Sequence, residues 1–209
     1  MTRAGQDKAP APEMAAPRHR GNRWGRSEQA RQAVLEAADD LLSERGFAGV
    51  TIEGIAAAAG VAKQTIYRWW SSKTDILMDA LLQDAAEELT PGDHGDLRED
   101  LSDHVSRVAA FLTRSDAGAV GRALIGQAQH DPAFATDFRA RFLSEQRERD
   151  RRPFDRAIAR GQIPASTDVP SDLDELLGPV YYRALVTGEP IDRQFTDHLV
   201  DHYLRRLAR

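Results

Sequence analysis

The chain contains no cysteine and no long hydrophobic run, and these two absences exclude several kinds of protein. Without cysteine among its 209 residues, it can form no disulfide, no cysteine-ligated zinc site and no thiol nucleophile. No apolar run reaches about 18 residues, and the N-terminus lacks the apolar core of a signal peptide. These features predict a cytoplasmic protein without a membrane segment.

The sequence also lacks the short motifs of common enzyme classes. It has no Gly-x-Ser-x-Gly nucleophile turn, no phosphate-binding glycine loop and no Ser-x-x-Lys motif. His198 and His202 have a spacing that can bind a metal on a helix, but no third ligand accompanies them, so they fit a position at a dimer rim better. We therefore expect no catalytic site, no metal and no cofactor.

Charge is distributed unevenly along the chain. The net charge of −5 argues against indiscriminate coating of nucleic acid. Residues 1–80 nevertheless contain 11 Lys+Arg against 10 Asp+Glu, so the acidic excess lies in the remainder. The densest basic cluster comprises Arg18, Arg20, Arg23, Arg26 and Arg31. A DNA-contacting surface is therefore expected near the N-terminus.

Apolar residues recur at helical spacing through most of the chain, and no alternating strand pattern accompanies them. The predicted fold class is all-α, with an N-terminal three-helix DNA-binding domain followed by a helical ligand-binding and dimerisation domain. The predicted domains are a disordered basic tail (1–25), a helix-turn-helix domain (26–75) and a regulatory domain (76–209). The first helix is predicted over residues 28–45, with Ser27 as its N-cap. Further helices are predicted over residues 52–59, 62–70, 73–89, 97–114, 116–129 and 192–207. Two more helices are predicted to begin at Pro132, with a kink or division at Pro153, and at a capping box that starts with Ser171.

The composition of the tail fits two interpretations. Its Ala, Pro and basic residues indicate a solvated leader, whereas its arginines also fit an arm that follows the DNA backbone or enters the minor groove.

Residues 51–77 have the pattern of a helix-turn-helix. Thr51 is a suitable N-cap for the first helix, and Gly60 can end it in the left-handed conformation. In the second helix, Ile66 and Trp70 share one face and are expected to point inward. The polar side chains that remain outside can enter a major groove.

This stretch resembles the TetR family of transcriptional regulators, almost continuously from about residue 30 to residue 77. The residues that carry the resemblance are Gly46-Phe47, Thr51-Ile52, Ile55-Ala56, Ala59-Gly60-Val61, Thr65-Ile66-Tyr67, Trp70, Ser72-Lys73 and Ile76-Leu77. The resemblance implies that Thr51, Tyr67 and Lys73 anchor phosphates. It also implies that Lys63, Gln64, Thr65 and Trp69 face bases or the nearby backbone.

Physical chemistry favours the same division between phosphate and base contacts. Glutamine can pair with adenine through two hydrogen bonds, so Gln64 is the preferred base reader, with an ordinary exposed glutamine as the alternative. The family often has a small residue at the position of Gln64, and histidine or tyrosine followed by phenylalanine where Trp69 and Trp70 stand. The predicted DNA-binding residues are Thr51, Lys63, Gln64, Thr65, Tyr67, Arg68, Trp69 and Lys73.

The C-terminal half more weakly resembles a regulatory domain found in part of the same family, through Arg160–Pro164, Asp168-Val169 and Gly178–Arg183. The resemblance implies a homodimer and a small effector, which the apolar bias suggests is hydrophobic. Apolar and aromatic stripes are also what an ordinary helical core contains. The residues expected to line a ligand pocket are Phe111, Phe134, Phe138, Phe142 and Tyr182. The residues expected at the dimer interface are Leu173, Leu177, Tyr181, Leu185, Phe195, Leu199 and Tyr203.

The predicted function is that of a dimeric, sequence-specific repressor, which a small hydrophobic ligand releases from a palindromic double-stranded DNA operator. A ligand-independent DNA-binding or architectural protein and a transcriptional activator remain as alternatives.

Overall fold

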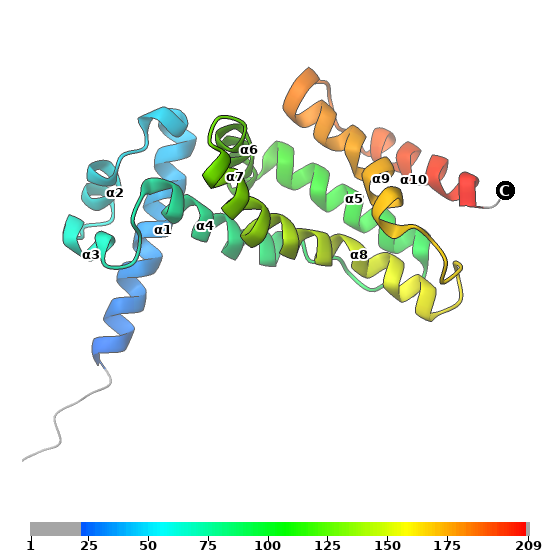
Figure 1. Ribbon diagram of the computed structural model, residues 1–209, viewed down its shortest axis with the longest axis horizontal. Helices are drawn as coiled ribbons and strands as arrows, with labels where there is room; N and C mark the ends of the chain where they lie inside the picture. Colours follow the sequence, from blue (N-terminus) through cyan, green and yellow to red (C-terminus); the bar gives the residue numbers. More distant parts are fainter. Residues whose placement is uncertain (1–21, 208–209) are drawn as a thin grey trace, which may run out of the picture.

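The computed structural model describes residues 22–207, with side chains from residue 26 onward, and contains only helices and their connections in that range. A group of helices at one end, α1 to α3, is joined through α4 to a larger group formed by α5 to α10 (Figure 1). The all-α prediction is confirmed for this part of the chain. Most of the predicted basic tail, residues 1–21, lies outside it.

The N-terminal group consists of α1 (Asn22–Gly49), α2 (Ile52–Ala58), α3 (Lys63–Tyr67) and the start of α4 (Lys73–Glu88). Helix α1 begins at Asn22, so the predicted start after Ser27 is wrong and the last residues assigned to the tail are helical. Gly46 interrupts α1 with φ of 66°, where a left-handed conformation favours glycine.

The helix-turn-helix forms as the caps predict. The Thr51 hydroxyl accepts a hydrogen bond from the Gly54 amide at 3.0 Å, which satisfies one free donor at the start of α2. Gly60 takes φ of 65° in the turn to α3. Ile55 and Ile66 are fully buried between the two helices, so α3 is fixed against α2 by packing.

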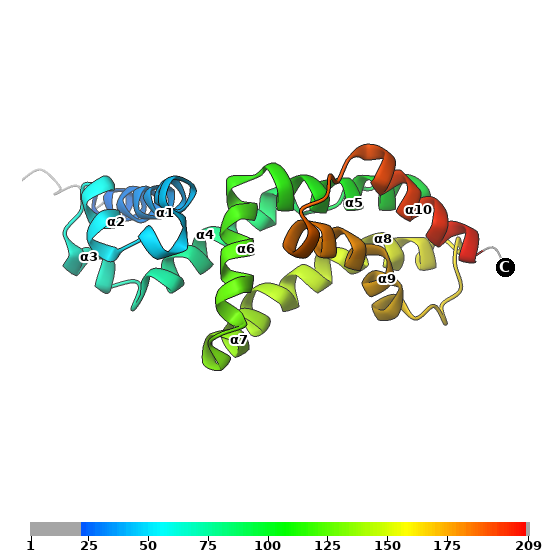
Figure 2. The same ribbon diagram turned by 90° about the horizontal axis from the view of Figure 1, so that it is seen from above.

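The second group comprises eight further elements, and Figures 1 and 2 show this group from two directions. They are α5 (Leu97–Arg114), α6 (Asp116–Ala128), α7 (Pro132–Phe138), the π-helical turn η1 (Arg139–Leu143), α8 (Ser144–Ala159), α9 (Val169–Tyr182) with the π-helical turn η2 (Arg183–Thr187), and α10 (Arg193–Leu207).

Two local predictions in this group differ from the structure. A division of the helix at Pro153 is wrong, because this residue lies inside α8; the π-helical turn η1 interrupts the α-helix earlier. Helix α9 is capped by Asp168, which accepts from the Ser171 amide, so Ser171 is not the N-cap. Pro170 fits in the first turn of α9 because its missing amide hydrogen would have no partner there.

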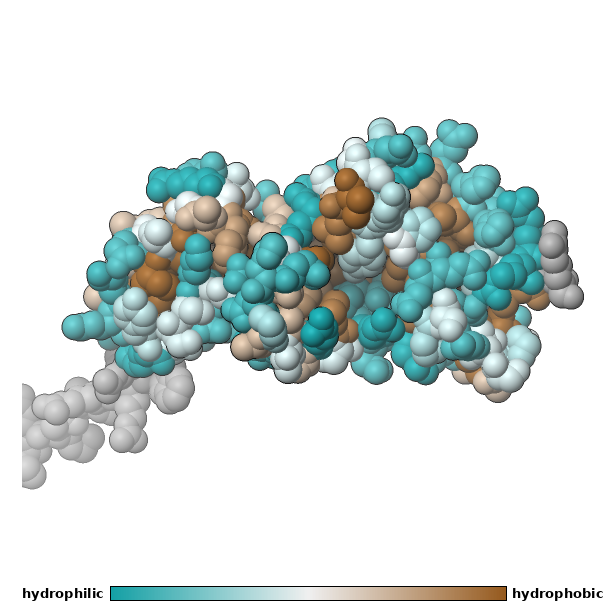
Figure 3. Space-filling view, turned by 45° about the horizontal axis from the view of Figure 1, so that its top comes forward, coloured by the Kyte–Doolittle hydropathy of each residue, from teal (hydrophilic) through white to brown (hydrophobic). Residues whose placement is uncertain are grey.

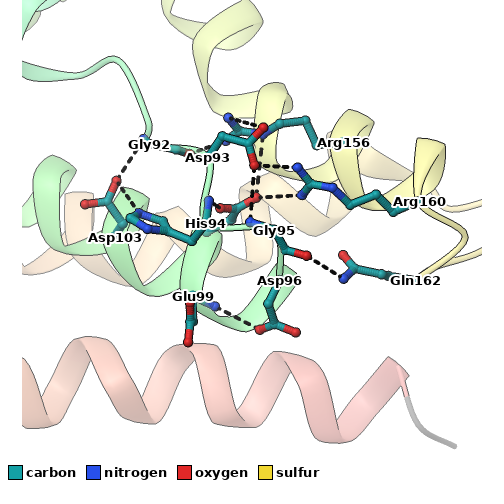
Figure 4. Close-up of polar contacts among 11 residues, drawn as sticks. Gly92, Asp93, His94, Gly95, Asp96, Glu99, Asp103, Arg156, Arg160 and Gln162 are labelled. Carbon is teal, nitrogen blue, oxygen red and sulfur yellow. Dashed lines mark hydrogen bonds and ion pairs between the residues drawn. The ribbon is translucent and has the colours of Figure 1, made fainter.

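A polar cluster ties the α4–α5 connection to α8 (Figure 4). Asp100 on α5 is completely buried and accepts a hydrogen bond from the His94 amide at 2.7 Å. Arg160 reaches both Asp100 and Asp93, and Arg156 donates to the Gly92 carbonyl. Because a buried carboxylate needs charged and hydrogen-bonding partners, this cluster fixes how α8 lies against the start of α5.

Acidic side chains gather where α1, α4 and α6 meet. Asp39 on α1 has a buried Oδ1 atom without a hydrogen-bond partner. Burial, together with the charges of Asp84, Asp40, Asp116 and Glu36, raises the pKa of Asp39 to about 7. The joint between the two helix groups therefore contains an uncompensated acid.

Lys73 fixes the start of α4 to the end of α1. Its ammonium donates to the Phe47 carbonyl at 2.7 Å and to the Val50 carbonyl at 3.0 Å. The same nitrogen lies 4.3 Å from the centroid of the Phe47 ring. These contacts satisfy carbonyls of the α1–α2 connection, so Lys73 holds the helix-turn-helix together internally.

We expect Asp39→Asn to stabilise the protein in a pH-dependent way. The folded state binds the Asp39 proton more tightly than an unfolded chain with a pKa of 3.8 does, so stability falls as pH rises from about 4 through 7. At pH 8 the substitution should raise the free energy of unfolding by about 1–3 kcal/mol, because the site stays partly solvated. Urea unfolding should show this gain shrinking below pH 7. A similar gain from the exposed control Asp40→Asn would contradict the assignment to Asp39.

We expect Lys73→Met to lower the free energy of unfolding by about 1–3 kcal/mol, because it leaves two carbonyls without their donor. The matched control is Lys63→Met on α3, whose ion pair with Glu53 is exposed, so its loss should lower the free energy of unfolding much less. Urea denaturation at pH 7 measures both. Equal stabilities of the two variants would show that Lys73 does not hold the helix-turn-helix together.

Candidate nucleic-acid interface

The outer face of α3 presents a row of polar and aromatic side chains. Ile66 and Trp70 are buried on the opposite side, as their spacing predicts. Tyr67 is 54% exposed, which is unusual for a large aromatic residue without a partner to cover it. The exposed residues of this face are Lys63, Gln64, Tyr67 and Arg68, with Thr65 and Trp69 half-buried beside them.

Two of the predicted contacts lie at the edges of this face. Thr51 uses its hydroxyl oxygen to cap α2, and the hydroxyl hydrogen remains available to a phosphate oxygen. Lys63 forms an ion pair with Glu53 at 3.0 Å, and this contact holds the pKa of Lys63 above its ordinary value. A phosphate would compete with Glu53 for the Lys63 ammonium.

Aromatic packing supports the C-terminal end of α3. The Arg68 guanidinium lies 4.9 Å from the centre of the Trp69 ring, and Trp69 meets Trp70 edge-to-face at 5.5 Å. Arg68 is therefore held beside the polar face by stacking, with its donors free to point toward an anion. Trp69 covers the junction between the exposed face and the core.

Asp79 on α4 connects α3 to both helix groups. Its Oδ2 atom accepts from the Trp70 indole at 2.9 Å and from Arg31 of α1 at 3.3 Å. Its Oδ1 atom accepts from Arg141 of η1 at 2.6 Å. One carboxylate thus touches the helix before the helix-turn-helix, the end of α3 and the regulatory helices.

The sequence analysis did not identify Asp79 or Arg141. A signal for Asp79 was present, because a buried tryptophan requires an acceptor for its indole N–H and Asp79 lies among the apolar residues of α4. Nothing in the sequence pattern pairs Arg141 with Asp79, since the two are far apart along the chain.

The aromatic residues expected to line a pocket form a row instead. Phe138 lies between Phe134, at 6.0 Å between ring centroids, and Phe142, at 5.2 Å. Phe111 is buried in the core, and Tyr182 is 59% exposed on α9. The structure thus brings together three of these five side chains in one aromatic row.

The residues expected at a dimer interface fall into two sets. Leu173, Leu177 and Tyr203 are buried within the protomer, and the Tyr203 hydroxyl donates to Asp172 at 2.8 Å. The remaining members have some exposed surface: Tyr181, Phe195 and Leu199 are half-buried, and Leu185 is 39% exposed.

A cavity of about 310 Å³ lies between the η1–α8 segment and α9. None of the five aromatic residues predicted to bind a ligand lines it. Its lining residues are Leu143, Gln146, Arg147, Asp150, Leu173, Asp174, Leu177, Gly178 and Tyr181.

The part of the chain that the structure describes contains no cluster of histidine and acidic residues suited to a metal ion. His198 and His202 are both exposed on α10. Within residues 22–207, no helix is long and apolar enough to cross a membrane.

Comparison with known proteins explains this architecture. Residues 34–80 match the sequence model of bacterial regulatory proteins of the tetR family, and residues 91–203 match that of the tetracyclin repressor-like C-terminal domain. The chain is 37% identical to the uncharacterized HTH-type transcriptional regulator YdeS of Bacillus subtilis (strain 168), over 84% of this chain and 88% of the relative. It is 29% identical to the DNA-binding transcriptional repressor TetR of Mycobacteroides abscessus, over 88% and 96% of the two chains.

Among solved structures, the TetR family transcription regulator SCO0332 superposes with a TM-score of 0.72 at 34% identity, covering 85% of this chain and 97% of the other. The family consists of DNA-binding proteins and not of enzymes, in agreement with the missing catalytic motifs. The chain belongs to the TetR family of helix-turn-helix transcriptional regulators.

Proposed function

We propose that the protein is a homodimeric repressor that binds a palindromic operator through α3 and leaves it when a small hydrophobic effector binds the C-terminal helices. The observation that carries this proposal is the outer face of α3, where exposed polar and aromatic side chains stand on a fully buried Ile66. As a regulator of DNA it would act in the cytoplasm.

Within this proposal, the residues on and around α3 have different roles in DNA binding. Gln64 is exposed and pairs with a base edge, with Thr65 and Trp69 beside it. Thr51, Lys63, Tyr67 and Arg68 contact phosphates and set the register. Lys73 acts differently from the sequence-based expectation, because its ammonium already donates to two carbonyls and supports the surface from below.

The second protomer would dock on the outer side of α9 and η2. Figure 3 shows a hydrophobic patch on this part of the surface. Tyr182, Leu185 and Val186 are exposed by 59%, 39% and 68%, and they are the large hydrophobic residues of the regulatory helices with such exposure. A self-complementary patch of this kind fits a two-fold dimer, which would place two α3 helices on half-sites about 34–36 Å apart.

Effector binding would be coupled to DNA binding through the contacts of Asp79. Arg141 belongs to η1, at the start of the cavity wall, and its guanidinium holds the same carboxylate that accepts from Trp70. An effector that prefers a different arrangement of η1 would therefore change the support of α3. A coupling free energy of about 1–3 kcal/mol would weaken DNA binding 5–150-fold.

Selection of bound sequences from random DNA at a stated salt concentration tests the DNA-binding proposal, and a palindrome is expected. Gln64→Ala should relax the preference at one position of each half-site, whereas Lys63→Met should weaken all sequences alike and lower the salt slope. Gln194→Ala, an exposed change on α10, serves as the control. If the Gln64 and Lys63 variants behaved alike, the division between base and phosphate contacts would be wrong.

We expect Val186→Asp to convert the dimer into a monomer, because it would bury a charge at the centre of the exposed patch. Light scattering at micromolar concentration measures the change, and affinity for the palindrome should fall at least about tenfold. Ala133→Asp places the same charge on an exposed position of α7 and should leave the mass unchanged. A Val186→Asp protein that remained dimeric would place the interface elsewhere.

A further inference from the structure

The cavity between α8 and α9 has apolar walls with a carboxylate in one of them. Leu143, Leu173, Leu177 and Tyr181 supply most of its hydrophobic surface. Asp150 also lines the cavity although only 7% of its surface is exposed. Such a site differs from an ordinary core gap, since a buried charge is costly unless something pairs with it.

Two buried side chains, an imidazole and an amide, hold the Asp150 carboxylate. Its Oδ1 atom accepts from the Gln146 amide at 2.7 Å and pairs with Nε2 of His104 at 2.9 Å. Both partners are almost fully buried, and Nδ1 of His104 has no hydrogen-bond partner. An amide and an imidazole thus orient the carboxylate.

The nearby arginines contact other groups, although Nη2 of the buried Arg149 has no hydrogen-bond partner. Arg149 donates from Nε to Gln146 at 3.0 Å and lies 3.7 Å from Glu145. Arg147 pairs with Asp174 at 3.3 Å at the cavity rim. Neither arginine forms an ion pair with Asp150, so the cavity presents a carboxylate beside the aromatic ring of Tyr181.

We propose that this cavity binds a compact hydrophobic amine, whose ammonium group pairs with Asp150 and whose apolar body packs against Leu143, Leu173 and Leu177. His104 and Gln146 are positioning residues that hold the carboxylate toward the cavity. The aromatic ring of Tyr181 adds a surface that favours a cation. The inference rests on the proposed function, because this amine would be the effector. It specifies where the effector binds and that the effector is positively charged.

The position of the cavity fits this role. Leu143 is the last residue of η1, and Gln146 follows in the first turn of α8. A ligand that contacts Leu143 therefore touches the same short π-helical turn that carries Arg141, the partner of Asp79. π-Helical turns of this kind are frequent at functional sites.

The test uses the full-length protein and three probes of similar shape: 2-phenylethylamine, 2-phenylethanol and 3-phenylpropionate. Isothermal titration should show the amine binding at least about tenfold more tightly than the alcohol, with the carboxylate weakest, because a hydrogen bond to a charged group is stronger than a neutral one. Equal affinity for the amine and the alcohol, or preference for the carboxylate, would overturn the inference without any variant.

Two variants locate the binding. Asp150→Asn should weaken amine binding about tenfold to hundredfold, whereas Asp155→Asn, outside the cavity on the same helix, should leave it unchanged. Gly178→Leu should block the amine by filling the cavity, since a side chain added at Gly178 meets no atom within 4 Å. Full amine binding by Gly178→Leu would overturn the site even if Asp150→Asn failed to fold.

Failure of the inference and failure of the proposed function are distinguishable. A protein that selects a palindrome but shows no preference for the amine retains the proposed function and loses this ligand class. An amine that binds in an Asp150-dependent manner without releasing DNA confirms the site and removes its role in regulation. An amine that binds a protein without operator affinity would contradict the repressor proposal alone.

Discussion

The placement of α3 depends on the hydrogen bonds and ion pairs that the Asp79 carboxylate accepts. Trp70 follows α3, and its buried indole N–H needs an acceptor, which the neighbouring helix α4 supplies. Asp79 provides it while also accepting from Arg31 and Arg141. Because a half-buried carboxylate with three donors is far more stable than one that has lost a partner, the positions of α1, α3 and η1 are not independent.

Much of the helix-turn-helix could be predicted because its determinants are local. Thr51 and Ser72 cap the helices that follow them, each by accepting a hydrogen bond from an amide three residues away. Gly60 turns the chain through its own left-handed backbone conformation. The role of Lys73 could not be read in the same way. Its carbonyl partners belong to the connection between α1 and α2, and only folding brings them within 3 Å of its ammonium.

The C-terminal helices could be predicted from periodicity, but the residues that line the cavity could not, for the same physical reason. Helical periodicity shows which residues turn inward, yet it cannot distinguish a core from an interface or a cavity wall. Leu173 and Leu177 are inward-facing residues of α9 that line a cavity, whereas Val186 lies on the exposed side. The buried pair of His104 and Asp150 joins α5 to α8 across a long stretch of sequence, which no motif records.

The π-helical turn η1 connects the wall of the cavity to the contacts of Asp79. It lies between α7 and α8, and it contains both Arg141 and Leu143, a residue of the cavity wall. A ligand can shift an equilibrium only by its difference in affinity between two conformations. A charged ligand held by Asp150 would stabilise one arrangement of η1, and the Arg141–Asp79 contact would extend that preference to Trp70. The energy available for release from DNA is therefore limited by how much more tightly Asp150 holds the ammonium group in that arrangement of η1 than in the other.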